Sequence, residues 1–197
     1  MSEMPVLETA RLLIRPFALG DLLNVHRLLD VELRDDLGSD TMDTLAERAE
    51  WLQWTVLNYR QLAKLRQPPY GDRAVALKST GELIGVCGFV PCLNMFGQLP
   101  GFGAGDSPPR PGGRYSTEFG LFYAVAPAHQ RRGYATEAAR ALVAYAFDQL
   151  QLTRVVATTT YDNAASIGVM RKLGMRIERN PLPEPRWLQV VGVLEGI

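Results

Sequence analysis

The segment from residue 117 to residue 150 has the pattern of a strand, a glycine-containing turn and a helix. The apolar run Thr117–Val125 predicts the strand, and apolar residues at helical spacing continue to Leu150. The turn between them contains Gln130, Arg131, Arg132, Gly133, Tyr134 and Ala135. Glycine lets a backbone approach a ligand closely, and the first turn of a helix presents unpaired N–H groups. The turn therefore predicts a phosphate site, with a basic, solvated helix start as the alternative.

Two adjacent arginines, Arg131 and Arg132, supply charge for further phosphates, so the pattern favours a ligand that carries a diphosphate. Coenzyme A fits that description. The sequence does not contain the P-loop pattern of glycine, four residues and Gly-Lys-Ser/Thr. The nearest approach to a dinucleotide fingerprint, Gly101–Gly105, lacks the spacing of the third glycine and a following helix, and it predicts a loop.

A Val- and Thr-rich strand pattern over Arg154–Thr160 is followed by a short helix pattern that ends at Gly174, a residue typical of a helix stop. With these residues in view, the chain resembles the GNAT superfamily of N-acetyltransferases. It is most similar to the RimJ/RimL-like branch, which acetylates the N-terminal amines of ribosomal proteins. The resemblance covers nearly the whole chain and is carried by Leu7–Phe17, Gly81–Gly85, Gln130–Ala138 and Asp162–Met175.

The resemblance implies an α/β (α+β) fold of the GNAT type, with a mixed central sheet of six to seven strands and about four helices. We expect one N-acetyltransferase domain over residues 1–197, a length that can bury an adequate core. Within it, residues 91–115 form a Gly/Pro-rich loop insertion. The implied cosubstrate is acetyl-CoA, with no metal.

The resemblance also implies the site residues. The backbone around Tyr123, Ala124 and Val125 would offer N–H groups to the thioester and the pantetheine arm, while the turn at residues 130–135 would bind the diphosphate. Asn163 and Ser166 lie three residues apart on one face of a helical turn, and they would contact the pantetheine and the leaving sulfur. Asn163 is equally well explained as a helix N-cap.

Two further positions concern proton transfer. Glu118 begins the strand before the turn, and it is predicted either to accept the proton of the amine, directly or through a water, or to be a surface carboxylate. Many GNAT enzymes have a tyrosine acid four residues after the serine, whereas this chain has Met170. Ser166 or a water would then protonate the thiolate, a small demand because a thiol titrates near ~8.5.

Composition limits the partners. The 21 basic and 21 acidic side chains cancel, so nothing indicates binding to nucleic acid or to an anionic membrane. No secretory signal pattern or run of about 20 apolar residues is present, and the cytoplasm is the expected location. The sequence leaves the oligomeric state open, a homodimer included.

The cysteines and histidines give little indication of chemistry. Cys87 and Cys92 lack partners at metal-ligand spacing and are predicted to be buried or half-buried free thiols. His26 follows an apolar helical stripe and is predicted to be structural, while His129 is predicted to be a solvated loop residue rather than a cofactor contact. The acidic residues Asp30, Glu32, Asp35, Asp36 and Asp40 are predicted to be a solvated helix end rather than an acidic cleft for a polycation.

The remaining patterns predict alternating elements. A strand is expected over Leu12–Phe17 and a helix over Leu19–Leu33. A capping box at Thr44–Glu47 begins a second helix, which ends before Pro68-Pro69 and would bury Leu45, Ala49, Leu52, Val56, Tyr59 and Ala63. Residues 74–78 and 82–90 predict a hairpin, and further strands are expected at Thr117, Arg154, Met175 and Trp187.

Residues 91–115 hold eleven glycines and prolines, so no regular element is expected there. Long loops in compact domains are often functional. We hypothesise that this segment forms a flap over the acceptor amine, which Phe96, Phe102 and Tyr115 would contact; a mobile insertion without such a role is the alternative.

The function expected from these features is transfer of an acetyl group from acetyl-CoA to a primary amine. The few proton-transfer groups favour an α-amine at a protein or peptide N-terminus, because it titrates near ~7.7 to 8.0, whereas a lysine amine titrates near ~10.4. Two alternatives stay open. One is the same reaction on a small amine, such as an amino acid, a polyamine or an aminoglycoside, and the other is a CoA-binding regulatory module without turnover.

Overall fold

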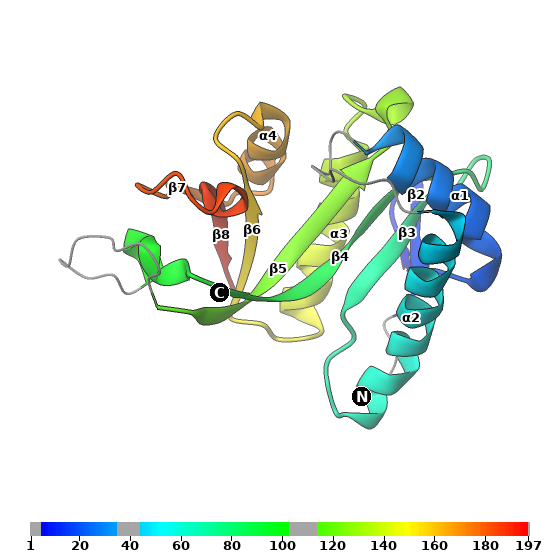
Figure 1. Ribbon diagram of the computed structural model, residues 1–197, viewed down its shortest axis with the longest axis horizontal. Helices are drawn as coiled ribbons and strands as arrows, with labels where there is room; N and C mark the ends of the chain where they lie inside the picture. Colours follow the sequence, from blue (N-terminus) through cyan, green and yellow to red (C-terminus); the bar gives the residue numbers. More distant parts are fainter. Residues whose placement is uncertain (1–4, 35–43, 103–113, 197) are drawn as a thin grey trace. The chain divides into compact units, whose positions relative to one another are not determined.

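The computed structural model describes residues 5–34, 44–102 and 114–196, and it contains one mixed sheet of eight strands (Figure 1). The strand order is β1-β2-β3-β4-β5-β6-β8-β7. The strands are β1 Leu7–Glu8, β2 Leu12–Pro16, β3 Gly71–Leu77, β4 Leu83–Asn94, β5 Ser116–Val125, β6 Arg154–Thr159, β7 Arg176–Arg179 and β8 Val190–Glu195. The predicted α/β class is confirmed, and the sheet has one strand more than the largest number expected.

Four α-helices accompany the sheet in the described residues: α1 Leu22–His26, α2 Leu45–Lys64, α3 Tyr134–Asp148 and α4 Ala164–Lys172. Helix α1 continues as a π-helical segment, η2 Arg27–Glu32. Short 3-10 turns are η1 Leu19–Asp21, η3 Phe96–Gln98, η4 Pro100–Phe102, η5 Pro127–His129 and η6 Arg186–Leu188. Strands β5 and β6 pair in parallel, with Gly120 opposite Val156. A parallel pair needs a long crossover, and α3 supplies it.

The chain divides into two compact units, which are described separately below. Unit 1 comprises Met1–Phe89 and Phe122–Leu142, and unit 2 comprises Val90–Leu121 and Val143–Ile197. Strands β4 and β5 and helix α3 each contribute residues to both units. The expectation of one N-acetyltransferase domain over the whole chain stays a prediction.

In unit 1 the helices α1 and α2 and the segment η2 pack on the sheet around a core that includes Phe17, Val25, Leu28, Leu52 and Val86. The predicted capping box begins α2: the Thr44 hydroxyl accepts from the Glu47 N–H at 3.2 Å, and the Glu47 carboxylate accepts from the Thr44 N–H at 2.7 Å. The helix ends at Lys64, before the two prolines, as expected.

The buried face of α2 differs from the predicted stripe. Leu45 is exposed, whereas Arg48 and Thr55 are buried together with Leu52 and Leu62. An apolar pattern does not predict burial of an arginine. Arg48 is buried because its charge is paired with that of Asp30. Its guanidinium donates from Nε to Asp30 Oδ2 at 2.8 Å.

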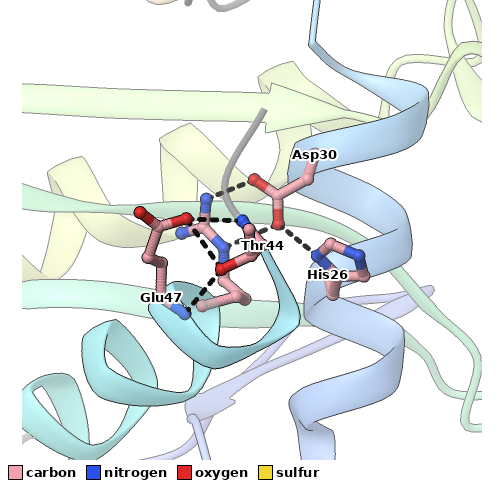
Figure 2. Close-up of polar contacts among 5 residues, drawn as sticks. His26, Asp30, Thr44 and Glu47 are labelled. Atoms are coloured by element: carbon pink, nitrogen blue, oxygen red, sulfur yellow. Dashed lines mark hydrogen bonds and ion pairs between the residues drawn. The ribbon is translucent and has the colours of Figure 1, made fainter. Parts of the chain in front are cut away.

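The prediction that Asp30 lies at a solvated helix end is also wrong. Asp30 lies in the π-helical segment η2 and is buried, and Figure 2 shows its carboxylate facing His26. His26 Nδ1 lies 2.8 Å from Asp30 Oδ2, so the histidine has the structural role predicted for it. The pair Asp30–Arg48 joins η2 to α2, and removing one partner of such a buried pair typically costs about 3–5 kcal/mol. Asp35, Asp36 and Asp40 lie outside the described residues.

Unit 2 has a second core around Phe96, Leu99, Val156, Leu188 and Val191. Part of the predicted loop 91–115 belongs to this core, which corrects the sequence interpretation. Strand β4 continues to Asn94, η3 and η4 follow, and Phe96 is fully buried. The buried Gln98 carboxamide accepts from Asn180 Nδ2 at 2.7 Å. Because Phe96 is buried, it cannot contact an acceptor as the flap hypothesis expected, and residues 103–113 lie outside the described residues.

Both cysteines are free thiols, as predicted: Cys87 is buried and Cys92 is half-buried. Burial raises the pKa of both thiols above the ordinary value. A thiol in this state is a poor nucleophile and a poor metal ligand. Among the described residues, no group of three or more histidine, cysteine or acidic side chains is arranged to hold a metal ion. The described helices include none that is long and apolar enough to cross a membrane.

Asp72 at the start of β3 has a pKa raised to about 6 by burial, which the nearby Arg48 only partly offsets. A raised carboxyl pKa means that the folded state binds the proton more tightly than the unfolded state. The stabilisation from the protonated form is therefore complete below about pH 4 and is lost as the pH rises to about 6.

We therefore predict that Asp72→Asn raises the stability at pH 7.5, by on the order of 1–2 kcal/mol, and changes it little at pH 4. Thermal unfolding at both pH values measures the difference. Asp148→Asn, at an exposed helix end, is the matched control and should shift Tm equally at the two pH values. An Asp72→Asn effect that does not depend on pH would contradict the prediction.

Candidate active site

In unit 1 the predicted turn has an unusual backbone. The 3-10 turn η5 ends at His129 and α3 begins at Tyr134. Between them, Arg131 and Gly133 have φ angles of 60° and 84°, in the left-handed region. The first bond of the helix runs from the Glu137 N–H to the Gly133 carbonyl at 2.9 Å. The N–H groups of the three residues before Glu137 therefore have no partner within the helix.

Left-handed residues next to a helix start turn successive N–H groups toward one side and form a concave anion-binding surface. The side chains of Arg131 and Arg132 are exposed, and neither forms an ion pair with any residue that the structure describes. Their charges remain available to an anionic ligand. The strand, turn and helix thus have the arrangement expected from the sequence, and the assignment of the turn as a cofactor site stays a prediction.

The strand that leads into the turn is held firmly. Gly85 of β4 lies so close to β5 that a Cβ atom would be 2.5 Å from the Ala124 carbonyl oxygen. Gln130 donates from Nε2 to the Val125 carbonyl at 3.1 Å. Its side chain therefore folds back on the strand and fixes the turn, and the cofactor contact predicted for this residue stays a prediction. Tyr123 and Ala124 are half-buried in β5.

His129 is not the solvated loop residue that was predicted. Its side chain is only 14% exposed, and Nε2 lies 3.3 Å from Glu82 Oε1. The ring centroid lies 6.3 Å from that of Tyr134. Glu82 precedes β4. No local sequence pattern predicts this pairing, because the two residues are 47 positions apart. His129 therefore joins the hairpin of β3 and β4 to the turn.

In unit 2, Glu118 is buried in β5, which excludes its interpretation as a surface carboxylate. Arg154, the first residue of β6, donates from Nε to Glu118 Oε2 at 2.8 Å, and its terminal nitrogen contacts the other carboxylate oxygen. The register that places Gly120 opposite Val156 also brings Glu118 level with Arg154. The guanidinium carbon lies 4.8 Å from the centroid of the Phe102 ring.

Arg154 is a residue that sequence reasoning missed. It was recognised only as the start of a strand, and its partner could be identified only from the parallel register of β5 and β6. Because Arg154 engages both carboxylate oxygens, a proton could reach Glu118 only at the remaining lone pairs. The base role proposed for Glu118 therefore has to operate beside a guanidinium.

Asn163 caps helix α4 in unit 2: its Oδ1 accepts from the Ser166 N–H at 2.9 Å. The N-cap interpretation of Asn163 is thus the one that the contacts support. Ser166 is half-buried in the first turn of α4, and its backbone rather than its hydroxyl makes the cap. The structure brings these two residues together, and it places Glu118 in the same unit.

Met170, at the position where many GNAT enzymes have a tyrosine, is fully buried in the core of unit 2. Its Sδ atom would lie 3.0 Å from a Cβ atom added to Gly192 of β8. Met170 is therefore a packing residue, and the space that a tyrosine would need is filled by β8. We assign it no part in proton transfer.

The mixed sheet, the parallel pair of β5 and β6 and the helix crossover that follows the arginine-rich turn agree with the α/β fold expected of an acetyltransferase. The sequence profile described as "Acetyltransferase (GNAT) domain" matches residues 11–176. The chain therefore belongs to the GNAT acetyltransferase family.

Two Bacillus subtilis proteins are similar in sequence. YnaD, described as an uncharacterized N-acetyltransferase, is 41% identical over 66 residues, which cover 34% of this chain and only 38% of YnaD. YoaA, described in the same words, is 25% identical over 175 residues, 88% of this chain and 84% of YoaA.

Two solved structures share the fold. An acetyltransferase from Agrobacterium tumefaciens has a TM-score of 0.69 and 22% identity, with 99% of this chain and 96% of that chain covered. RimL, described as a ribosomal L7/L12 alpha-N-protein acetyltransferase in complex with coenzyme A, has a TM-score of 0.66 and 15% identity, with 98% of each chain covered. At these identities the likeness establishes the fold alone.

We predict that Gly133→Ala weakens CoA binding through backbone strain. An added Cβ would meet only Arg11 at 3.5 Å, so space is adequate, but φ of 84° is unfavourable for alanine by about 1–2 kcal/mol. The Kd for CoA, measured by calorimetry, should rise by up to about tenfold to thirtyfold. Gly174→Ala is the matched control: Gly174 follows α4 with φ of 83° and open space around an added Cβ, so stability should fall similarly while the Kd stays unchanged. Equal CoA affinity in both variants would show that the turn does not bind the cofactor.

Proposed function

We propose that this protein transfers an acetyl group from acetyl-CoA to the N-terminal α-amine of a protein or peptide. The structure of the turn before α3 supports acetyl-CoA as the acetyl donor. Its free N–H groups, its two left-handed residues and its two exposed arginines form an anion site in unit 1.

A diphosphate matches this turn because the backbone donors supply short-range hydrogen bonds and the arginines supply charge at longer reach. In this proposal Gly133, Tyr134 and Ala135 bind the diphosphate through their backbone, while Arg131 and Arg132 neutralise it and any additional phosphate. The backbone of Tyr123–Val125 accompanies the pantetheine arm. RimL, which shares the fold, was solved with coenzyme A bound, and this supports the choice of ligand.

The proposed reaction is a direct attack. The nitrogen of a neutral amine forms a bond with the thioester carbonyl carbon, the carbon–sulfur bond breaks, and the electron pair leaves on the thiolate. One proton departs from the nitrogen and one proton reaches the sulfur. We assign the first to Glu118 through a water molecule, because Arg154 already engages both of its oxygens. We assign the second to the Ser166 hydroxyl, on the first turn of the helix that Asn163 caps.

The acceptor class follows from the small number of proton-transfer groups in the proposed site. One carboxylate acting through a water molecule and one serine hydroxyl suit an amine that is already partly neutral. An α-amine, with a pKa near ~7.7 to 8.0, is substantially neutral at physiological pH, whereas a lysine amine near ~10.4 is not. RimL is described as an alpha-N-protein acetyltransferase, and this agrees with the proposed acceptor.

Unit 2 also offers a place for an acceptor side chain. An open pocket of about 340 Å³ is lined mainly by apolar groups, including those of Met95, Leu182, Pro185 and Trp187. The Trp187 indole donates to Asn94 Oδ1 at 3.3 Å, which fixes one wall. We propose that the pocket accepts the first side chain of the acceptor peptide. An apolar wall does not suit polyamines or aminoglycosides, whose charges it cannot satisfy.

The acceptor is tested by release of free thiol from acetyl-CoA in the presence of peptides with different first residues, free amino acids, polyamines and aminoglycosides. We expect release with peptides, faster when the first side chain is apolar, and no release with peptides whose N-terminus is already blocked. Release that requires a small amine would move the function to small-molecule acetylation. Cofactor binding without release for any acceptor would support the regulatory alternative.

We predict that Ser166→Ala lowers kcat by about tenfold and changes the KM for acetyl-CoA less, because the hydroxyl acts on the leaving sulfur. The substitution keeps the Ser166 N–H and therefore the cap from Asn163, so helix α4 should still form. Ser79→Ala, in the exposed turn between β3 and β4, serves as the control with unchanged kinetics. An unchanged kcat in Ser166→Ala would remove Ser166 from the reaction.

A further inference from the structure

The carboxylate of Glu137, in the first turn of α3, is bound by a segment that precedes β2. Thr9 donates from Oγ1 to Glu137 Oε1 at 2.6 Å, and the Arg11 N–H donates to the same oxygen at 2.9 Å. Arg11 Nε donates to Oε2 at 2.7 Å. Both carboxylate oxygens are therefore occupied by residues more than 120 positions earlier in the chain.

The Arg11 side chain also contacts the turn itself. Its NH1 donates to the Arg132 carbonyl at 3.0 Å, and its guanidinium carbon lies 4.3 Å from the centroid of the Tyr134 ring. A Cβ atom on Gly133 would lie 3.5 Å from its NH2. The Arg11 guanidinium thus contacts Arg132, Tyr134 and Glu137, which surround Gly133 in the chain.

Arg11 is fixed at its backbone as well. Its N–H is bound by Glu137, and its carbonyl accepts from the Lys78 N–H at 2.9 Å. Thr9 and Leu12 form a tight local turn, in which the Leu12 N–H donates to Thr9 Oγ1 at 2.9 Å. The guanidinium therefore extends from a rigid edge of the sheet, and the turn can be positioned against it.

The charge of Glu137 gives these contacts a second consequence. Burial acts to raise the pKa of Glu137, but the hydrogen bonds from Thr9 and Arg11 outweigh it and hold the pKa below its ordinary value. The carboxylate is consequently ionised at neutral pH. An ionised group in the same helical turn as a phosphate site would repel the ligand unless a cation lay beside it, and Arg11 is that cation.

We infer that Arg11, Thr9 and Glu137 form a brace that holds the turn at residues 131–136 in its anion-binding conformation. This inference rests on the proposed binding of CoA at that turn. Arg11 is a positioning residue, because its Nε donates to Glu137 and its NH1 donates to the Arg132 carbonyl, both within the protein. The brace also neutralises Glu137, so that the helix start keeps its affinity for an anion.

Substitutions separate the two functions of the brace, which are to hold the turn in place and to neutralise Glu137. In Glu137→Gln the amide nitrogen cannot accept from Arg11, so the brace is weakened although the negative charge is gone. Positioning predicts a Kd for CoA that rises by about tenfold, whereas a role in charge alone predicts tighter binding. Arg11→Ala, which loses the brace and leaves the carboxylate unneutralised, should raise the Kd by about thirtyfold or more. Arg11→Lys keeps the charge without the forked geometry and should give an intermediate Kd.

Arg15→Ala is the matched control. Arg15 lies four residues further along the same edge and forms a comparable two-point pair with Asp21, at 2.8 Å for each contact. Its loss should lower Tm in the same way as loss of Arg11, while the Kd for CoA stays at the wild-type value. In Arg11→Ala the KM for acetyl-CoA should rise, and kcat at saturating acetyl-CoA should remain near that of the wild type.

Amide hydrogen exchange in the ligand-free protein gives a readout that does not depend on CoA. The amide of residue 137, the first in α3 that is bonded within the helix, should exchange faster in Arg11→Ala and Glu137→Gln than in the wild type or Arg15→Ala. Equal exchange and equal Kd in Arg11→Ala and Arg15→Ala would overturn the brace, as would tighter CoA binding by Glu137→Gln. Faster exchange in the Arg11 variant, combined with no CoA binding by the wild-type protein, would retain the brace as a structural element and reject the proposed function.

Discussion

A helix must begin with backbone donors that have no partner of their own, and the first turn of α3 is where this chain uses that constraint. Strand β5 delivers the chain to the turn, and Arg131 and Gly133 take left-handed conformations that orient the donors. Residues before β2 then fix the turn from outside through Glu137. The proposed anion site therefore depends on the segment before β2 as well as on the turn, although the two are remote in sequence.

The second constraint is that a charge removed from water needs a partner. Asp30 is paired with Arg48 in unit 1, and Glu118 is paired with Arg154 in unit 2. The Asp30–Arg48 pair joins η2 to α2, and the Glu118–Arg154 pair joins β5 to β6. These pairs connect the elements that carry the two partners, and the second one holds the Glu118 carboxylate beside a guanidinium.

The sequence was sufficient for features that are local. The capping box at Thr44, the helix start after Gly133, the free thiols and the α/β class all follow from neighbouring residues or from the resemblance. It was insufficient where a side chain meets a partner far along the chain, as in Asp30 with Arg48, His129 with Glu82 and Glu118 with Arg154. The glycine and proline content after Pro91 likewise concealed the continuation of β4 and the buried Phe96, because composition does not report burial.

Helix α4 shows how a departure from the family pattern is accommodated. Asn163 caps the helix through the backbone N–H of Ser166. Four residues later Met170 fills the space against Gly192, and a phenol at that position would have to displace β8 or leave the core. The chain has therefore exchanged an acid at this position for packing. A leaving thiolate of low basicity can tolerate that exchange, since water or a single hydroxyl is enough to protonate it.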